Sequence, residues 1–196
     1  MSDPMISRLV RPALLLVAGM LLGQGALAVA APAAPQGTTQ TRIASCSGFG
    51  FQPIDADTGY TWDGRHLYRS NSKGDGWFMC PVDLPHRAVV TRVRFTLSDA
   101  SSSVGFEYCG LVRSALGVSG TVQVVGLPVS GIGIGAEPGT VRYPTTSIQN
   151  ATIDNGSFAY ALQCRMVFAP GLQSISSDRL GIIGADVTFR ISTANG

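Results

Sequence analysis

Hydrophobic and polar residues alternate most regularly between Leu84 and Asp99. One set of alternate positions is apolar, aromatic or β-branched, and the other set includes two arginines. The first set is Val89, Thr91, Val93, Phe95 and Leu97, and the second set is Val90, Arg92, Arg94 and Thr96. Because successive side chains of a strand point to opposite faces of its sheet, this pattern predicts a central strand with one buried face.

Short runs of the same kind recur along the rest of the chain, separated by residues that favour turns. They cover residues 45–51, 77–82, 104–113, 120–129, 141–153, 157–168 and 182–192. No long stretch has the period and the caps of an α-helix. Asp154-Asn155-Gly156 predicts a type I′ hairpin turn between two of these runs, because asparagine and glycine suit its positive φ angles. We therefore predict an all-β fold of about eight strands, arranged as a two-sheet antiparallel sandwich.

The first 31 residues have the three parts of a secretory signal peptide. Arg8 and Arg11 precede the apolar run Ala13–Leu22, and small residues at 26–30 offer two cleavage sites. We predict cleavage, a disordered linker over residues 32–42 and one β-sandwich domain over residues 43–196. An uncleaved membrane anchor is the alternative, because no charged residue occurs between Arg11 and Arg42. After cleavage we expect no membrane association.

Export places the four cysteines in an oxidising compartment, either extracellular or periplasmic. They are Cys46, Cys80, Cys109 and Cys164. An even number in an exported chain predicts two disulfide bonds, for which three connectivities exist. We prefer Cys46–Cys80 with Cys109–Cys164, because the second pair would join two strands that are neighbours in a common sandwich topology. Cys109 is out of phase with the apolar residues before it, so this pairing calls for a β-bulge near Gly110.

The charge balance gives no reason to expect a nucleic-acid partner. The formal net charge is +2, and it falls to +1 without the first 31 residues, because Arg8, Arg11 and Asp3 are lost. A nearly neutral domain has no electrostatic attraction for a phosphate backbone or an anionic membrane surface.

Three segments resemble a pattern found in small secreted bacterial β-sandwich proteins. They are Leu84–Phe95, with Pro85, Ala88, Val90, Thr91 and Val93; Ile153–Asn155, with the later Tyr160; and Gly184–Val187. The resemblance spans residues 77–192. This chain departs from the pattern at Arg87, where glycine is more usual, and in its four cysteines. The resemblance implies an exported, jelly-roll-like sandwich, in a group mostly without assigned activity.

Four aromatic residues in and beside the long polar region 52–76 are the candidate ligand-binding residues. They are Tyr60, Trp62, Tyr68 and Trp77. Exposed rings stack on the apolar faces of sugars, while neighbouring aspartate, asparagine and arginine side chains bond the hydroxyl groups. The alternative is that these rings cover one end of the core.

The sequence contains no recognisable catalytic set and implies no cofactor. A Ser/His/Asp hydrolase would need His66 or His86 as its base, and no serine stands in a Gly-x-Ser-x-Gly sequence. Asp55 and Asp57 resemble the opening of a calcium loop, but its later positions lack the required glycine and glutamate. An irregular calcium site therefore stays open, with an ordinary aspartate turn as the alternative.

We predict a secreted, non-catalytic binding module whose partner is a polysaccharide or a surface protein. A carbohydrate or another polymer is the first candidate ligand. The alternative is an assembly protein of the cell surface that pairs through its sheet edges. A secreted hydrolase is the third interpretation.

Overall fold

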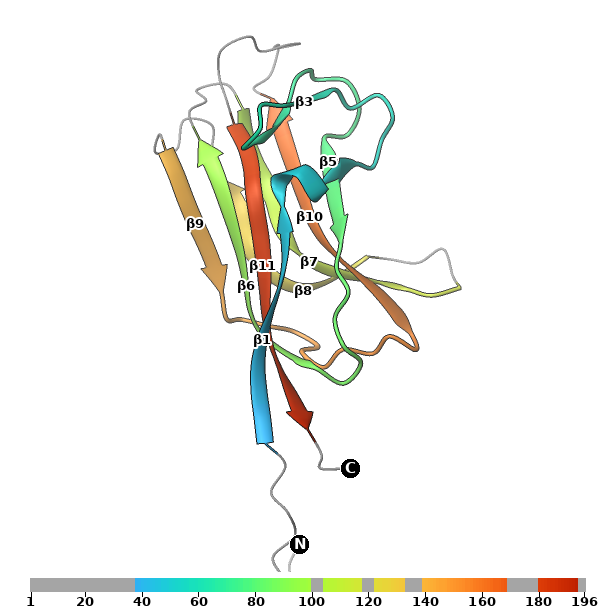
Figure 1. Cartoon of the computed structure of the whole chain (residues 1–196). Helices are drawn as coiled ribbons and strands as arrows, with labels where there is room; N and C mark the ends of the chain where they lie inside the picture. Colours follow the sequence, from blue (N-terminus) through green and yellow to red (C-terminus); the bar gives the residue numbers. More distant parts are fainter. Residues whose placement is uncertain (1–37, 100–103, 118–121, 133–138, 169–179, 194–196) are drawn as a thin grey trace, which may run out of the picture. The chain divides into compact units, whose positions relative to one another are not determined.

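A computed structural model describes residues 38–99, 104–117, 122–132, 139–168 and 180–193 of the chain (Figure 1). The predicted signal peptide and residues 32–37 of the predicted linker lie outside these ranges. Within them the chain forms two antiparallel sheets and one short 3-10 turn, η1 (Gly48–Gly50). No helix in the described ranges is long and apolar enough to cross a membrane.

The first sheet has the order β3-β4-β11-β6-β9, and β1 also pairs with β11. Its strands are β1 (Thr38–Ser47), β3 (Tyr60–Trp62), β4 (Leu67–Arg69), β6 (Val89–Asp99), β9 (Gly139–Thr145) and β11 (Leu180–Thr193). The second sheet has the order β2-β5-β10-β7-β8. Its strands are β2 (Gln52–Pro53), β5 (Trp77–Pro81), β7 (Val104–Ala115), β8 (Gln123–Ile132) and β10 (Phe158–Phe168).

The longer strands follow the jelly-roll order. When the short strands β2, β3 and β4 are set aside, the sheets read β1-β11-β6-β9 and β5-β10-β7-β8. Among these eight strands of the described ranges, the chain crosses between the sheets at almost every connection, and only β7 and β8 are both consecutive and paired. Two such interlocked sheets define a jelly roll. The predicted all-β sandwich is therefore confirmed, with three short strands added to the eight expected.

The inner faces of both sheets supply the core. The largest side chains that are almost fully buried come from strands of the two sheets and from the loops that close the ends. They include Phe51, Leu67, Phe78, Leu84, Phe95, Leu97, Phe106, Leu111, Ile153, Leu162, Met166 and Leu180. Burial of this apolar area is the main favourable contribution to folding.

The alternation predicted for β6 holds from Val93 onward and fails at its start. Val93, Phe95 and Leu97 are buried as predicted. Val90 is also buried, whereas Val89 is 40% exposed, opposite to the prediction. The pairing of β6 with β11 shifts register between Thr188 and Phe189. A register shift of this kind reverses the face on which the following residues lie.

The domain begins earlier than the sequence predicted. β1 starts at Thr38 and pairs with β11 along its whole length, from Thr38 opposite Thr193 to Ser47 opposite Gly184. Residues 38–42, predicted as part of a disordered linker, are therefore strand. Their side chains are polar and exposed, so the apolar pattern that marks a buried strand is missing there.

The predicted strand over residues 141–153 is shorter, and the predicted type I′ turn is wrong. β9 ends at Thr145, and the following residues form only isolated bridges at Ile148 and Thr152. Neither Asn155 nor Gly156 has a positive φ angle. Instead, the carbonyl oxygen of Asp154 accepts hydrogen bonds from the backbone N–H groups of residues 157 and 158, which turns the chain into β10.

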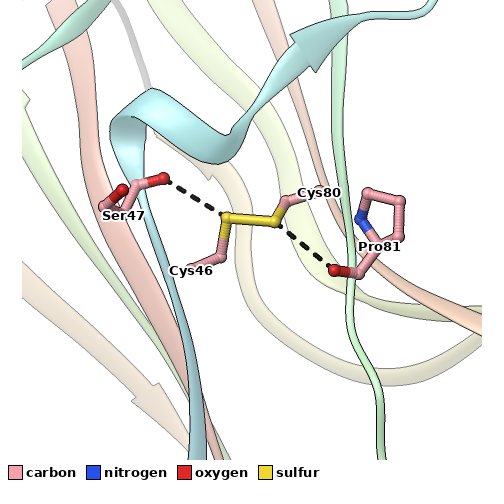
Figure 2. The surroundings of a disulfide bond; sticks show 4 residues. All are labelled: Cys46, Ser47, Cys80 and Pro81. Atoms are coloured by element: carbon pink, nitrogen blue, oxygen red, sulfur yellow. Dashed lines mark hydrogen bonds between the residues drawn. A yellow bond between two sulfur atoms is a disulfide. The ribbon is translucent and has the colours of Figure 1, made fainter.

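The two disulfide bonds join the pairs that the sequence analysis preferred. Cys46, at the end of β1, is bonded to Cys80 of β5 and so links the two sheets (Figure 2). Figure 2 also shows the carbonyl oxygens of Ser47 and Pro81, which lie 3.3 and 3.5 Å from the two sulfur atoms. Cys109 of β7 is bonded to Cys164, the residue directly opposite it on β10.

A β-bulge brings Cys109 into the core. Opposite β10, the register of β7 shifts so that Glu107 is the extra residue between Phe106 and Tyr108. Phe106 and Cys109 are consequently both buried on the inner face. The pairing of β7 with β8 also shifts at Gly110, where the sequence predicted an irregularity.

Arg87 offers a test of backbone strain. Its φ angle is +64°, a left-handed conformation, in a turn closed by hydrogen bonds from Ala88 N–H to Pro85 O and from Arg87 N–H to Ile153 O. A Cβ atom in this conformation costs about 1–2 kcal/mol, and the greater entropy that glycine loses on folding offsets part of the gain from removing it. We therefore expect Arg87→Gly to raise the free energy of unfolding by about 0.5–1 kcal/mol. Denaturant unfolding measures the change.

The matched control for Arg87→Gly is Asn150→Gly. Asn150 has a φ angle of +49°, but asparagine adopts left-handed conformations more readily than other side chains do. Its gain should be smaller than that of Arg87→Gly. A lower unfolding midpoint for Arg87→Gly would contradict the assignment of strain.

The disulfide bonds give a second prediction for stability. They close segments with sequence separations of 34 and 55 residues. The chain-entropy relation then gives about 4 kcal/mol for each bond. We expect each double alanine variant, Cys46→Ala/Cys80→Ala and Cys109→Ala/Cys164→Ala, to lose about this much in denaturant unfolding. A loss below about 1 kcal/mol for either pair would show that the bond does not restrict the unfolded chain as this model assumes.

Candidate functional site

The structure separates the four predicted aromatic residues into three places. Tyr60 and Trp62 lie on the same face of β3, whereas Tyr68, on β4, lies on the opposite face of the same sheet. Trp77 belongs to β5, in the other sheet. These rings therefore do not form one platform, and each position has to be considered by itself.

Tyr60 and Trp62 border a small cavity of about 210 Å³. The ring of Trp62 contacts the exposed ring of Phe49 edge to face, with 5.6 Å between centroids. Trp62 is half-buried and packs against the core, while Tyr60 is 45% exposed. The surroundings of Trp62 agree with the alternative that this ring covers one end of the core.

Tyr68 is buried and belongs to a polar cluster with Asp63 and His66. Its hydroxyl group donates a hydrogen bond to Asp63 Oδ2 at 2.8 Å and lies 2.8 Å from His66 Nδ1. Asp63 Oδ1 also accepts hydrogen bonds from the backbone N–H groups of Arg65 and His66, at 3.0 and 2.9 Å. The N–H group of Arg65, followed by the Tyr68 hydroxyl group, lowers the pKa of Asp63 far below its ordinary value of 3.8.

The two histidines are held in polar contacts rather than beside a nucleophile. His66 Nδ1 lies 3.2 Å from Asp63 Oδ1, which is the contact that orients a catalytic base. Among the described residues, however, no serine, threonine or cysteine side chain has a hydrogen bond to His66. His86 Nδ1 accepts the backbone N–H group of Asn155 at 3.2 Å. The described part of the chain thus shows no Ser/His/Asp triad.

Asp55 forms the aspartate turn that the sequence analysis named as the alternative to a calcium site. Its Oδ1 atom accepts the N–H group of Asp57 at 2.9 Å, and its Oδ2 atom accepts the N–H group of Asp75 at 3.1 Å. Both oxygens of Asp55 therefore bind backbone donors. No cluster of three or more histidine, cysteine or acidic side chains suited to a metal ion occurs among the described residues.

Trp77 lies at one end of a groove on the outer face of the second sheet. Because paired residues share a face, the strand register places them in rows across β5, β10 and β7. The rows are Trp77–Arg165–Tyr108, Met79–Gln163–Gly110 and Pro81–Ala161–Val112, with Ala159–Ser114 beyond them. Ala159 and Ala161 of β10 have short side chains, so the surface of the sheet is recessed there between larger neighbouring side chains.

The groove has a volume of about 510 Å³ and a mostly apolar lining. Ile54, Trp77 and Met79 line one part, and Val112 and Val122 line another. Gln163 and Ser114 supply polar groups within it. Small-molecule sites typically have volumes of about 300–1,000 Å³ with a few polar groups in an apolar surface, so this groove has the size and composition of a binding site.

Charged and aromatic side chains gather at the Trp77 end of the groove. The Arg165 guanidinium group lies 5.4 Å from the Trp77 ring centroid, and its Nη1 atom lies 2.8 Å from Glu107 Oε2. Tyr108 contacts Trp77 edge to face, with 5.6 Å between centroids. Burial raises the pKa of Tyr108 to about 12, and its buried hydroxyl group has no hydrogen-bond partner among the described residues. These contacts hold Trp77 in position at the sheet surface.

Among the four predicted residues, Trp77 alone lines this groove, and the residues that accompany it there were not predicted. Tyr108, Gln163 and Arg165 come from strands that are distant in sequence, and only the register brings them to one face. The alternate, outward positions of β10 contain a detectable signal. They are Ala159, Ala161, Gln163 and Arg165, a change from small to polar residues along one face.

Comparison with solved structures finds a likeness to a protein described as xylan-binding module CBM15. The TM-score is 0.38 and the sequence identity is 8%, over 78% of this chain and 96% of that chain. No family model matches the chain, and no curated protein matches it. A likeness this weak carries no argument about the ligand, which has to be inferred from the groove itself.

The contacts of Asp63 predict a pH effect on stability. Its pKa is lower in the folded chain than its ordinary value of 3.8, so the ionised carboxylate contributes stability that is fully present above about pH 4. This contribution is lost as the pH falls through the folded-state pKa. We expect Asp63→Asn to lower the melting temperature at neutral pH, with a deficit that shrinks below pH 4. Melting curves over a pH series measure it.

The exposed carboxylate of Asp83 provides the control for this series. Asp83→Asn should change the melting temperature little at every pH. A deficit in Asp63→Asn that is the same at acid and neutral pH would contradict an ionic role for Asp63.

Proposed function

We propose that the protein is a non-catalytic, extracellular binding module that holds a polysaccharide chain in the groove on the outer face of β5, β10 and β7. The observation that carries the proposal is the groove itself. It combines an aromatic ring, Trp77, with a mostly apolar surface and a few polar side chains. The apolar face of a sugar ring needs a flat apolar partner, and its hydroxyl groups need donors and acceptors at the rim.

The strand scaffold supports a binding role. The groove surface is formed by three paired strands whose inner side chains are buried in the core, among them Phe78, Leu111 and Leu162. A rigid sheet holds its outward side chains in fixed relative positions, which lowers the entropy lost when a ligand binds. The two disulfide bonds suit an oxidising compartment and favour a location outside the cytoplasm.

Two of the sheet edges, those at β8 and β9, favour this proposal over assembly through strand pairing. β8 and β9 are the edge strands on one side of the two sheets, and each contains a proline, Pro128 and Pro144. Proline has no backbone N–H group to donate to an incoming strand. Edges interrupted in this way are typical of sheets that do not extend by pairing with another chain.

The test is binding of the domain to a panel of neutral and acidic polysaccharides, with Trp77→Ala measured beside it. We expect Trp77→Ala to weaken binding about tenfold or more, because stacking on an aromatic ring is a major part of the affinity of such sites. Its melting temperature should change little, since the ring lies on the outer face and is only half-buried. Isothermal titration measures the soluble members of the panel, and pull-down measures the insoluble ones.

The matched control is Tyr60→Ala, which removes an exposed ring from the other sheet. Its binding should equal that of the parent protein. Equal binding by Trp77→Ala and the parent protein would rule out the groove as the site. A release of sugar products during the assay would contradict a non-catalytic role.

A further inference from the structure

A second cavity lies next to the Trp77 end of the groove. It has a volume of about 290 Å³ and lies between β4, β10 and the segment 72–75. Two arginines, Arg69 and Arg165, line it together with Ser72 and Asp75. Arg165 connects the two places, because it lines this cavity and its guanidinium group also lies over the Trp77 ring, which lines the groove.

Arg69 is a buried cation that forms no ion pair with any described carboxylate. The residue is 4% exposed, and within the described ranges its guanidinium group donates hydrogen bonds to three backbone carbonyl oxygens, those of Met166, Lys73 and Gly74. None of the described carboxylates lies within ion-pair distance of it. The Nε atom is buried and has no partner among the described residues. Buried charges in proteins are normally paired, so this arrangement is unusual.

The neighbouring charges act on Arg69 in both directions. Burial, and next the positive charge of Arg165, lower the pKa of Arg69, whereas the negative charges of Asp75 and Asp55 raise it. Arg165 is itself engaged at Nη1 by Glu107 and at Nε, which donates to the carbonyl oxygen of Asp75 at 3.1 Å. Two guanidinium groups thus border one cavity, and the buried Nε atom of Arg69 has no hydrogen-bond partner among the described residues.

We propose that this cavity binds the carboxylate of a uronic acid residue in the polysaccharide that occupies the groove. This inference rests on the proposed function. The planar, forked donors of guanidinium groups match the geometry of a carboxylate, and a hydrogen bond between charged groups is stronger than one between neutral groups. The Trp77 ring would bind the apolar face of a sugar, and Arg165 would hold the acidic substituent beside it.

Asp75 acts against an anion in this cavity. Its exposed carboxylate lines the same space, so it repels a bound uronate. Replacing it with asparagine removes the negative charge and keeps the shape of the side chain. The variant Asp75→Asn should therefore bind the acidic ligand more tightly, a gain that a purely structural role of the two arginines does not produce.

The experiment compares each acidic ligand with its own methyl ester. Oligosaccharides of galacturonic acid and of mannuronic acid are titrated as free acids and as methyl esters, which differ only in charge and in one methyl group. The parent protein should prefer the acid roughly tenfold or more. Arg165→Gln should abolish this preference, and Asp75→Asn should increase it. Arg142→Gln, which removes an exposed arginine from β9, is the control and should leave it unchanged.

Arg69→Met tests the buried cation directly, after circular dichroism has shown that the variant is folded. If it does not fold, Arg165→Gln and Asp75→Asn decide the question. Equal affinity for acids and esters in the parent protein, with both lost in Trp77→Ala, would overturn the carboxylate site and leave the groove intact. Absence of binding to every saccharide would overturn both proposals.

Discussion

The bond between Cys46 and Cys80 is the constraint on which the arrangement of the two sheets at the groove depends. β5 has five residues, and it pairs with five residues of β10 and two of β2. Such a short strand has few hydrogen bonds to hold it. The disulfide ties it across the core to the end of β1, in the other sheet (Figure 2). Trp77 is the first residue of the strand held in this way, so the wall of the groove is fixed by a covalent bond as well as by packing.

The inner and outer faces of the sheets have separate roles. The inner faces are almost entirely apolar and give the domain its stability. The outer face of the second sheet carries aromatic, small and charged side chains in rows, which suit a ligand better than a core. Because strand side chains alternate strictly, one sequence specifies both faces at once. A change at an outward position can therefore alter binding while leaving the core undisturbed.

The alternation of apolar and polar residues along the chain predicted the class of fold, but it could not predict the strand register or the positions of the β-bulges. The pattern in β6 identified a buried strand, while the register shift opposite Thr188 and Phe189 exchanged the faces at its start. The order of Phe106 and Cys109 showed that a bulge was needed, and only the pairing with β10 located it at Glu107. Local sequence reveals the phase of a strand, whereas a bulge depends on the partner strand as well.

The groove could be predicted only in part for the same reason. Tyr60 and Tyr68 are close in sequence, yet the alternation of short strands places them on opposite faces of a sheet. Trp77 and Tyr108 are far apart in sequence, yet their rings are in contact, because their strands β5 and β7 lie on either side of β10. Proximity in sequence was thus a poor guide to proximity in the site, because most neighbours in a jelly roll come from distant segments.

The pairing of the first and last strands has a mechanical consequence. Thr38 faces Thr193, so the two ends of the described domain lie side by side, as the blue and red strands of Figure 1 show. A pulling force between these ends breaks the hydrogen-bonded pairs of β1 and β11 one after another, beginning at the pair of Thr38 and Thr193. The separation of β1 from β11 can advance only as far as Cys46, because the disulfide bond there transmits the force to Cys80 of the opposite sheet. The terminal strand can therefore peel under tension while the groove beyond the bond keeps its shape.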